Sequence, residues 1–200
     1  MRYLMTFSYD GSNYNGYQKQ PNVNTIQSEI ENKLKQINSN KQVDIHASGR
    51  TDAKVHALNQ KAHFDLDIDI SPENLKKALN SLINKDIYIK DIIEVDNNFH
   101  ARFNVKTKEY MYVINIGEYN PIEKDYVYQY NKKLNIEEMK KALNYLEGTH
   151  NFKSFTKAEV EKETNDFVRT IIKTNLLIEN DKITISFLGT GFMRYMVRNM

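Results

Sequence analysis

The sequence contains no cysteine, no tryptophan, only three prolines and only seven glycines among its 200 residues. The absence of cysteine excludes disulfide bonds, thiolate nucleophiles and cysteine-ligated metal sites, and it fits a reducing compartment. No apolar run approaches the length of a membrane-spanning helix, and the amino-terminal MRYLMTFSYDG is too short and too polar for a signal peptide. We therefore expect a cytoplasmic protein that makes no contact with a membrane.

The charges nearly balance, with 28 basic and 26 acidic residues and a net charge of +2, so net charge alone predicts no partner. The distribution is more informative, because aromatic and basic side chains alternate in FHARFNVKTKEYMY (99–112). Most of these aromatic residues are expected in a sheet core. Tyr110 and Tyr112 share a face by the period-two rule, and such tyrosines also stack on RNA bases.

Hydrophobic periodicity predicts an α+β protein with a mostly antiparallel sheet and a few helices. No linker rich in Pro, Gly or Ser separates two halves, 1–104 and 105–200, so we expect them to share one sheet. Helices are expected to begin after the N-caps Asn24, Ser71 and Asn135, with a C-cap at Gly148 and a last helix within 191–200. Strands are expected at 2–9, 43–48, 61–68, 86–95, 108–117, 167–179 and 182–189.

A polar decapeptide, SGRTDAKVHA (48–57), connects two of the expected strands. A Thr-Asp pair in a loop is usually a solvated turn or a helix cap. Arg50, however, lies close enough to keep the Asp52 carboxylate ionised and oriented, and Gly49 leaves space for a ligand. A carboxylate presented in this way serves as a general base, a metal ligand or a covalent nucleophile, and the pattern does not choose among these roles.

The remaining signals for metal or nucleotide chemistry are weak. The histidines, at positions 46, 56, 63, 100 and 150, show no metal-binding spacing, and we expect structural roles for them. The glycines of YDGSNYNGYQKQP (9–21) match neither a P-loop nor a dinucleotide-binding motif. Nucleoside-triphosphate chemistry is therefore disfavoured.

Six blocks of the sequence resemble the tRNA pseudouridine synthase A family, in family order from the first residues to the last. SGRTDAKVHA resembles the signature GRTDxGVHA, and YDGSNYNGYQKQP resembles YDGxxxxGWQxQ with Tyr17 in place of tryptophan. The other four blocks are KAHFD, FHARFNVKTKEYMY, GTHNFKSFTK and GTGFMRYMVRN. One block alone is a moderate signal, whereas six in order are specific.

The resemblance implies two ferredoxin-like halves with a cleft between them, usually in a homodimer. It implies that the chain isomerises uridine to pseudouridine at positions 38 to 40 of the tRNA anticodon stem-loop, without a cofactor or a metal. By the same resemblance Asp52 is the catalytic aspartate and Arg50 a cleft arginine. Tyr110 stacks on the target base, and Arg198 pairs with the catalytic carboxylate.

Two departures from the family pattern carry expectations of their own. Lys54 stands where the family has glycine, and lysine costs on the order of 1 kcal/mol there if the position needs a positive φ. The family continues beyond MVRNM, so we expect the carboxyl-terminal half to be incomplete. The alternative to an enzyme is a tRNA-binding module without turnover; a metal hydrolase lies far behind both.

Overall fold

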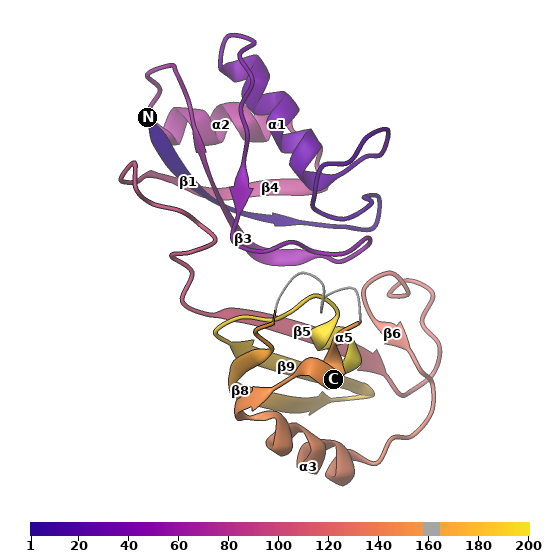
Figure 1. Ribbon diagram of the computed structural model, residues 1–200. Helices are drawn as coiled ribbons and strands as arrows, with labels where there is room; N and C mark the ends of the chain where they lie inside the picture. Colours follow the sequence, from indigo (N-terminus) through magenta and orange to yellow (C-terminus); the bar gives the residue numbers. More distant parts are fainter. Residues whose placement is uncertain (158–164) are drawn as a thin grey trace. The chain divides into compact units, whose positions relative to one another are not determined.

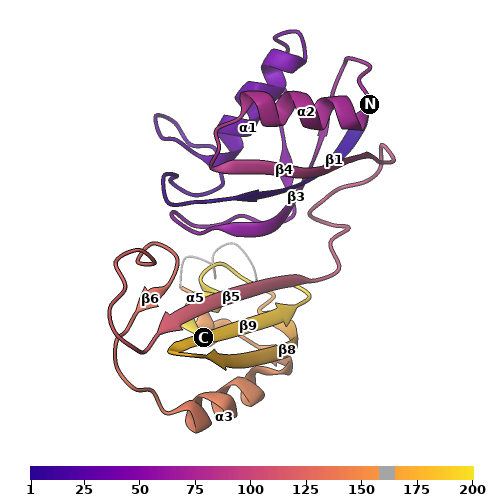
Figure 2. The same ribbon diagram turned by 180° about the vertical axis from the view of Figure 1, so that it is seen from behind.

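We describe residues 1–157 and 165–200 of a computed structural model, in which the chain divides into two compact units. Unit 1 spans residues 1–105 and unit 2 spans residues 106–200. Each unit contains its own sheet (Figures 1 and 2). Among the described residues, no helix is both long enough and apolar enough to cross a membrane.

Unit 1 is a four-stranded antiparallel sheet with the strand order β2-β3-β1-β4. Helices α1 and α2 lie on the same face of this sheet (Figures 1 and 2). The elements in chain order are β1 (Arg2–Tyr9), α1 (Ile26–Ile37), β2 (His46–Ala47), β3 (Ala57–Asp65), α2 (Pro72–Leu82) and β4 (Ile87–Glu94).

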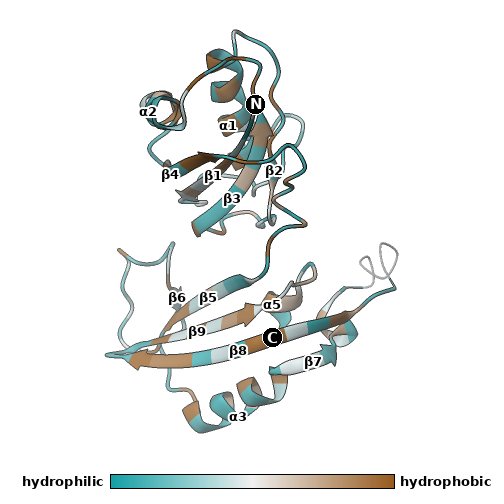
Figure 3. Cartoon of the chain, turned by 90° about the vertical axis from the view of Figure 1, so that its left-hand side faces the viewer, coloured by the Kyte–Doolittle hydropathy of each residue, from teal (hydrophilic) through white to brown (hydrophobic). Residues whose placement is uncertain are grey.

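The core of unit 1 follows from the alternation along β1, where Tyr3, Met5 and Phe7 are completely buried. These side chains meet the apolar stripes of the helices, which include Ile30 of α1 and Leu79 of α2. The hydropathy colouring shows β1 and β4 as largely hydrophobic (Figure 3). Burial of one side chain of this size stabilises a fold by about 1.5–3 kcal/mol, so the sheet is firmly anchored to both helices.

The expected helix starts in unit 1 are partly confirmed. Ser71 caps α2, with Pro72 as its first residue. The N-cap of α1, however, is Thr25 and not Asn24, because Thr25 forms a capping box with Ser28. The carbonyl of Asn24 instead accepts a hydrogen bond from the backbone of Asn15. A cap with two reciprocal hydrogen bonds satisfies more of the free amides at the helix start.

The strand expected at 43–48 is shorter than predicted and covers only His46–Ala47. The reason lies in a side chain of α1, because Glu31 Oε1 accepts the backbone N–H of Ile45 at 3.2 Å. That amide is therefore unavailable for a strand partner. The strand expected at 61–68 begins earlier, at Ala57, and ends at Asp65.

Unit 2 is a five-stranded sheet with the order β6-β5-β9-β8-β7, antiparallel except for the parallel pair β5–β6. Helix α3 packs against β8. The elements are β5 (Lys108–Asn115), β6 (Tyr128–Gln129), α3 (Ile136–Leu146), β7 (Gly148–Asn151), η1 (Lys153–Phe155), β8 (Val168–Glu179), β9 (Lys182–Gly189) and α5 (Met196–Asn199).

The helix ends of unit 2 differ from expectation in two places. Asn135 caps α3 as predicted, accepting a hydrogen bond from the Glu138 amide. The C-cap of α3 is Glu147, and Gly148 follows it with a φ of +104° at the start of β7. The last helix begins only at Met196, because Tyr195 has a φ of +68° that breaks a continuous helix.

The α+β class and the mostly antiparallel pairing are confirmed, but the described strands form two sheets and not a shared one. Residues 96–104, between β4 and β5, form turns in place of a strand. The backbone amides of Phe99 and Phe103 donate to Asp96 and His100, three residues back. The segment between β4 and β5 therefore adds no strand to either sheet.

Candidate active site

The decapeptide 48–57 forms the connection between β2 and β3, and hydrogen bonds to β3 fix its first residues. The Ser48 amide donates to the Lys61 carbonyl at 2.8 Å. Gln60, which is buried, donates through Nε2 to the Gly49 carbonyl at 2.9 Å and accepts from Ser48 Oγ at 2.8 Å. The loop therefore leaves the sheet in a defined direction.

The segment 9–17 holds the loop on both sides of Asp52. The Tyr17 amide donates to the Thr51 carbonyl at 3.0 Å, and the Lys54 amide donates to the Tyr14 carbonyl at 3.3 Å. The hydroxyls of Tyr9 and Thr51 are 2.8 Å apart and share a hydrogen bond. Because the residues before and after Asp52 are both tethered, the backbone that carries this carboxylate is fixed.

Two glycines of segment 9–17 make this close packing possible. A Cβ atom at Gly16, which has a φ of +88°, would lie 2.9 Å from the Thr51 carbonyl oxygen. A Cβ atom at Gly11 would lie 2.2 Å from the Val55 carbonyl oxygen. Any side chain at either position would push the loop away. These glycines therefore serve backbone contact with the Asp52 loop.

A polar contact at the far end of the loop joins the same two segments. His56 Nδ1 lies 3.0 Å from Asp10 Oδ1 and 3.2 Å from the Gly11 amide nitrogen. Both side chains are about 30 % exposed. His56 thus links the end of the decapeptide to the turn after β1, which agrees with the structural role expected for it.

Lys54 has a φ of +64°, the positive φ at which lysine is expected to be costly. A non-glycine residue in this left-handed region costs on the order of 1–2 kcal/mol relative to the right-handed region. The loop therefore adopts a backbone conformation that suits glycine, with lysine in that place. The strain lies two residues beyond Asp52.

The four residues singled out from the sequence lie in different parts of the structure. Asp52 is partly exposed and Arg50 is exposed, and both belong to the loop of unit 1. Tyr110 lies on β5 and Arg198 lies in α5, both in unit 2.

Tyr110 is held within unit 2 by packing against an aromatic neighbour. It pairs with Phe187 across β5 and β9, and its ring meets Phe192 edge to face with 5.1 Å between centroids. Its side chain is only partly exposed. The ring is therefore oriented by its surroundings before any substrate binds.

The short helix α5 is anchored although it has only four residues. Met196 is completely buried with Phe152 and Ile171 in the core of unit 2. Asn199 Nδ2 donates to the Phe155 carbonyl at 2.9 Å. This anchoring places the exposed Arg198 close enough to Tyr112 for its positive charge to oppose the rise in the pKa of that tyrosine.

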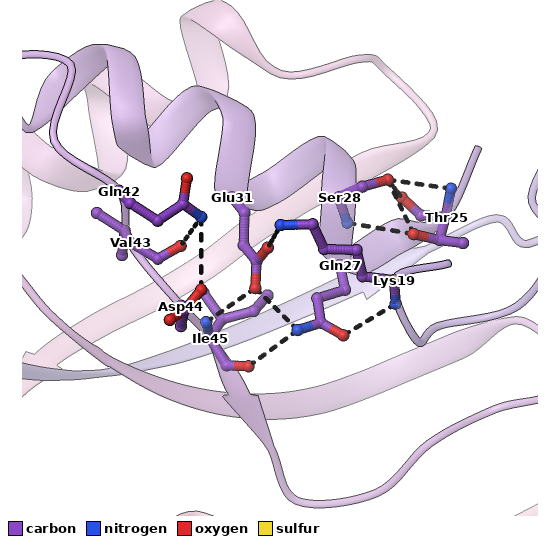
Figure 4. Close-up of polar contacts among 9 residues, drawn as sticks. All are labelled: Lys19, Thr25, Gln27, Ser28, Glu31, Gln42, Val43, Asp44 and Ile45. Carbon is purple, nitrogen blue, oxygen red and sulfur yellow. Dashed lines mark hydrogen bonds and ion pairs between the residues drawn. The ribbon is translucent and has the colours of Figure 1, made fainter. Parts of the chain in front are cut away.

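Sequence reasoning missed Glu31, a carboxylate on α1 that is only 2 % exposed. It accepts hydrogen bonds from Lys19 Nζ at 2.9 Å, from Gln27 Nε2 at 2.8 Å and from the Ile45 amide at 3.2 Å (Figure 4). Gln27 Oε1 also accepts from the Lys19 amide at 3.0 Å. Glu31 and Gln27 thus connect α1 both to the segment after Tyr17 and to the strand that enters the Asp52 loop.

The sequence held one signal for this network, namely the spacing of four residues between Gln27 and Glu31. That spacing places both side chains on one face of a helix. The direction of this face relative to the apolar stripe depends on the tertiary structure. The buried carboxylate was therefore not predictable from the pattern alone.

Three histidines that are distant in the sequence lie together in unit 1. The ring centroid of His63 is 5.0 Å from that of His46 and 4.5 Å from that of His100. His63 is 3 % exposed, and its burial, together with His100 and His46, lowers its pKa to about 4. Within residues 1–157 and 165–200, no group of three or more His, Asp or Glu side chains is arranged to hold a metal ion.

Comparison with known proteins adds to this geometry. The family described as tRNA pseudouridine synthase matches residues 5–104 and 142–200. A tRNA pseudouridine synthase A from an Exiguobacterium species is 46 % identical over all of this chain and 79 % of its own length. Proteins of the same name from a Geobacillus species and from Thermosipho melanesiensis are 44 % and 41 % identical, covering 98 % and 100 % of this chain and 79 % and 81 % of their own.

A carboxylate loop on an α+β fold, together with these matches, defines an isomerase that acts on RNA. The chain belongs to the tRNA pseudouridine synthase family, with the tRNA pseudouridine synthase A proteins as its relatives. The match leaves residues 105–141 uncovered. Assignments for Tyr110 therefore rest on the motif in 99–112 and on geometry.

Proposed function

We propose that this protein converts uridine to pseudouridine at positions 38 to 40 in the anticodon stem-loop of tRNA, with Asp52 as the reacting carboxylate. One observation carries the proposal. The backbone is tethered at Thr51 and at Lys54, on both sides of Asp52, by a glycine-containing segment of the same unit. A reacting group needs such a defined position, because small displacements reduce rates strongly.

The reaction requires no net gain or loss of atoms. The bond between uracil N1 and ribose C1′ breaks, the base turns, and C1′ bonds to C5. The proton on C5 leaves and N1 takes up a proton. A carboxylate starts this path by attack at C1′ or at C6, or by removing a proton on a route through a glycal. Each route uses an ionised Asp52, and none calls for a cofactor or a metal.

The other residues have separate roles in this proposal. The target uridine must leave its stack, and Tyr110 receives the extruded base on its ring. Arg198 pairs with the catalytic carboxylate, and Arg50 contacts the RNA beside it. Two copies of the chain form the working homodimer.

A tritium-release assay tests the function directly. The full chain is incubated with tRNA labelled at uracil C5, with a chelator present that leaves the tRNA folded. We expect tritium release, and mapping of pseudouridine to positions 38 to 40. Binding of tRNA without release would identify a binding module, the alternative that the strained Lys54 favours. Activity that returns only with added zinc would contradict the metal-free mechanism.

A further inference from the structure

Unit 2 exposes a row of three tyrosines at the edge of its sheet: Tyr112 on β5, Tyr128 on β6 and Tyr130 directly after β6. We call these residues the tyrosine ladder. Their exposed fractions are 51 %, 53 % and 36 %. The ring centroids of successive members are 6.2 Å and 6.3 Å apart, with interplanar angles of 35° and 33°.

The sheet geometry puts the ladder on a single face. Tyr128 is the register partner of Ile114 in the parallel pair β5–β6. Tyr112 lies two residues before Ile114, and side chains two apart in a strand point the same way. Tyr130 follows the end of β6, and its ring lies beside that of Tyr128, with 6.3 Å between centroids. By the same rule Tyr110 lies on this face. The ladder therefore continues from the tyrosine proposed to stack on the target base.

Hydrogen bonds of Asn115 fix the backbone that carries the ladder. Asn115 Nδ2 donates to Gln129 Oε1 at 2.8 Å, and the Asn115 carbonyl accepts from the Tyr130 amide at 3.0 Å. Asn115 is itself only 4 % exposed. The rings thus project from a fixed edge, and little conformational entropy is lost when a planar group binds them.

The charges around the ladder are suited to RNA. Lys132 and Lys133, separated from Tyr130 only by Asn131, are exposed. Burial and the neighbouring Tyr128 raise the pKa of Tyr112, although the positive charge of Arg198 acts in the opposite direction. The Tyr112 phenol is therefore uncharged at neutral pH and does not repel phosphate. Its hydroxyl remains a donor for a phosphate or a 2′-hydroxyl.

We propose that the tyrosine ladder is a docking surface for unstacked nucleotides of the tRNA, next to the one that enters the reaction. This inference rests on the proposed function. Contiguous exposed aromatic rings on a single chain mark an interaction site, and aromatic rings stack on any base because every base has a π-face. Tyr128 and Tyr130 lie within residues 105–141, which the family match leaves uncovered, whereas Tyr112 also belongs to the block 99–112 that resembles the family.

Substitutions of the central tyrosine test the proposal on the full chain. Tyr128→Ala and Tyr128→Leu remove the aromatic face, and Tyr128→Leu keeps the apolar packing of β6. Tyr128→Phe keeps the face and loses only the hydroxyl. The matched control is Tyr145→Ala, since Tyr145 is 83 % exposed and lies on α3, which is not part of the ladder. For each variant we measure tRNA affinity by fluorescence anisotropy, the melting temperature, and kcat and KM by tritium release.

We expect Tyr128→Ala and Tyr128→Leu to bind tRNA at least about fivefold more weakly, with a raised KM and an unchanged kcat. Tyr128→Phe and Tyr145→Ala should bind as the wild type does. A Tyr128→Leu variant with wild-type melting and wild-type affinity would overturn the proposal. So would loss of dimerisation in that variant with unchanged tRNA affinity, because the surface would then serve a second copy of the chain.

The two proposals fail in different ways. If the wild-type chain releases no tritium but Tyr128→Leu still weakens tRNA binding, the catalytic proposal fails and the ladder stands. If the wild-type chain releases tritium and every ladder variant binds tRNA normally, only the ladder fails.

Discussion

Replacing Glu31 with glutamine removes the charge of a buried carboxylate without changing its shape. Three donors converge on this carboxylate, from Lys19, Gln27 and the backbone of Ile45 (Figure 4). The amide group of glutamine offers one acceptor oxygen and one NH₂ donor. At least one of the three donors in Glu31→Gln must therefore lose its acceptor or face another donor.

The expected loss of stability follows from the surroundings of each donor. A hydrogen bond to a charged group contributes roughly 1.5–3 kcal/mol to the free energy of unfolding. The share of Lys19 is smaller, because its side chain is 52 % exposed and solvent screens the pair. The Ile45 amide is buried, so the loss of its acceptor costs the most free energy. We expect Glu31→Gln to lower the free energy of unfolding of unit 1 by about 2–3 kcal/mol.

Thermal melting and kinetics measure this effect, with an exposed ion pair as control. The melting temperature of unit 1 should fall by about 8–24 °C, and kcat should fall more than KM rises, because the network supports the Asp52 loop. Glu73→Gln removes a similar pair, 2.7 Å from Lys77 but with side chains 76 % and 69 % exposed. It should leave the melting temperature almost unchanged, because solvent screens this exposed pair. Equal melting temperatures for the two variants would refute this reasoning.

Substitutions at four further positions give clear expectations. Lys54→Gly should raise stability by about 0.5–1 kcal/mol and Lys54→Ala should not, since only glycine relieves the positive φ; equal melting of both would refute the strain. Tyr17 is 2 % exposed, and its hydroxyl has no hydrogen-bond partner among the described residues, so Tyr17→Phe should be neutral or stabilising by about 1 kcal/mol. Tyr3→Phe should instead destabilise by a similar amount, about 1 kcal/mol, because it loses a 2.7 Å hydrogen bond to the Ile70 carbonyl. The pKa of His63 falls from its ordinary value of 6.5 to about 4 in the folded state. The contribution of the neutral imidazole to the free energy of unfolding is therefore fully present above pH 6.5 and is lost as the pH falls toward 4. That loss should approach about 3 kcal/mol and vanish in His63→Gln but not in His150→Gln, as shown by melting from pH 7 to pH 4; an unchanged pH dependence in His63→Gln would contradict it.

Local signals predicted much of the fold. Asn135 and Ser71-Pro72 marked helix starts correctly, because capping depends on a few adjacent residues. The strands expected at 167–179 and 182–189 leave Asn180 and Asp181 for the turn between β8 and β9, where Asn180 has a φ of +53°. Such features need no knowledge of the rest of the chain.

The features that sequence reasoning missed depend on tertiary contacts. The strand at 43–48 was cut short by a side chain of α1, Glu31, twelve or more residues away. Gly11 and Gly16 belong to a block that resembles the family, but the pattern did not indicate that both allow the Asp52 loop to approach. The clustering of His46, His63 and His100 depends both on the pairing of β2 with β3 and on the turn at 96–104. Pattern and propensity do not report which distant segments meet.

The most direct test of the central claim is tritium release by Asp52→Asn with labelled tRNA, alongside tRNA affinity. Asparagine keeps the size of the side chain and removes the carboxylate that is proposed to react. We expect release to fall to background while affinity for tRNA stays within a few-fold of the wild type. A variant that retains a substantial fraction of the wild-type rate would contradict the account and remove Asp52 from the reaction.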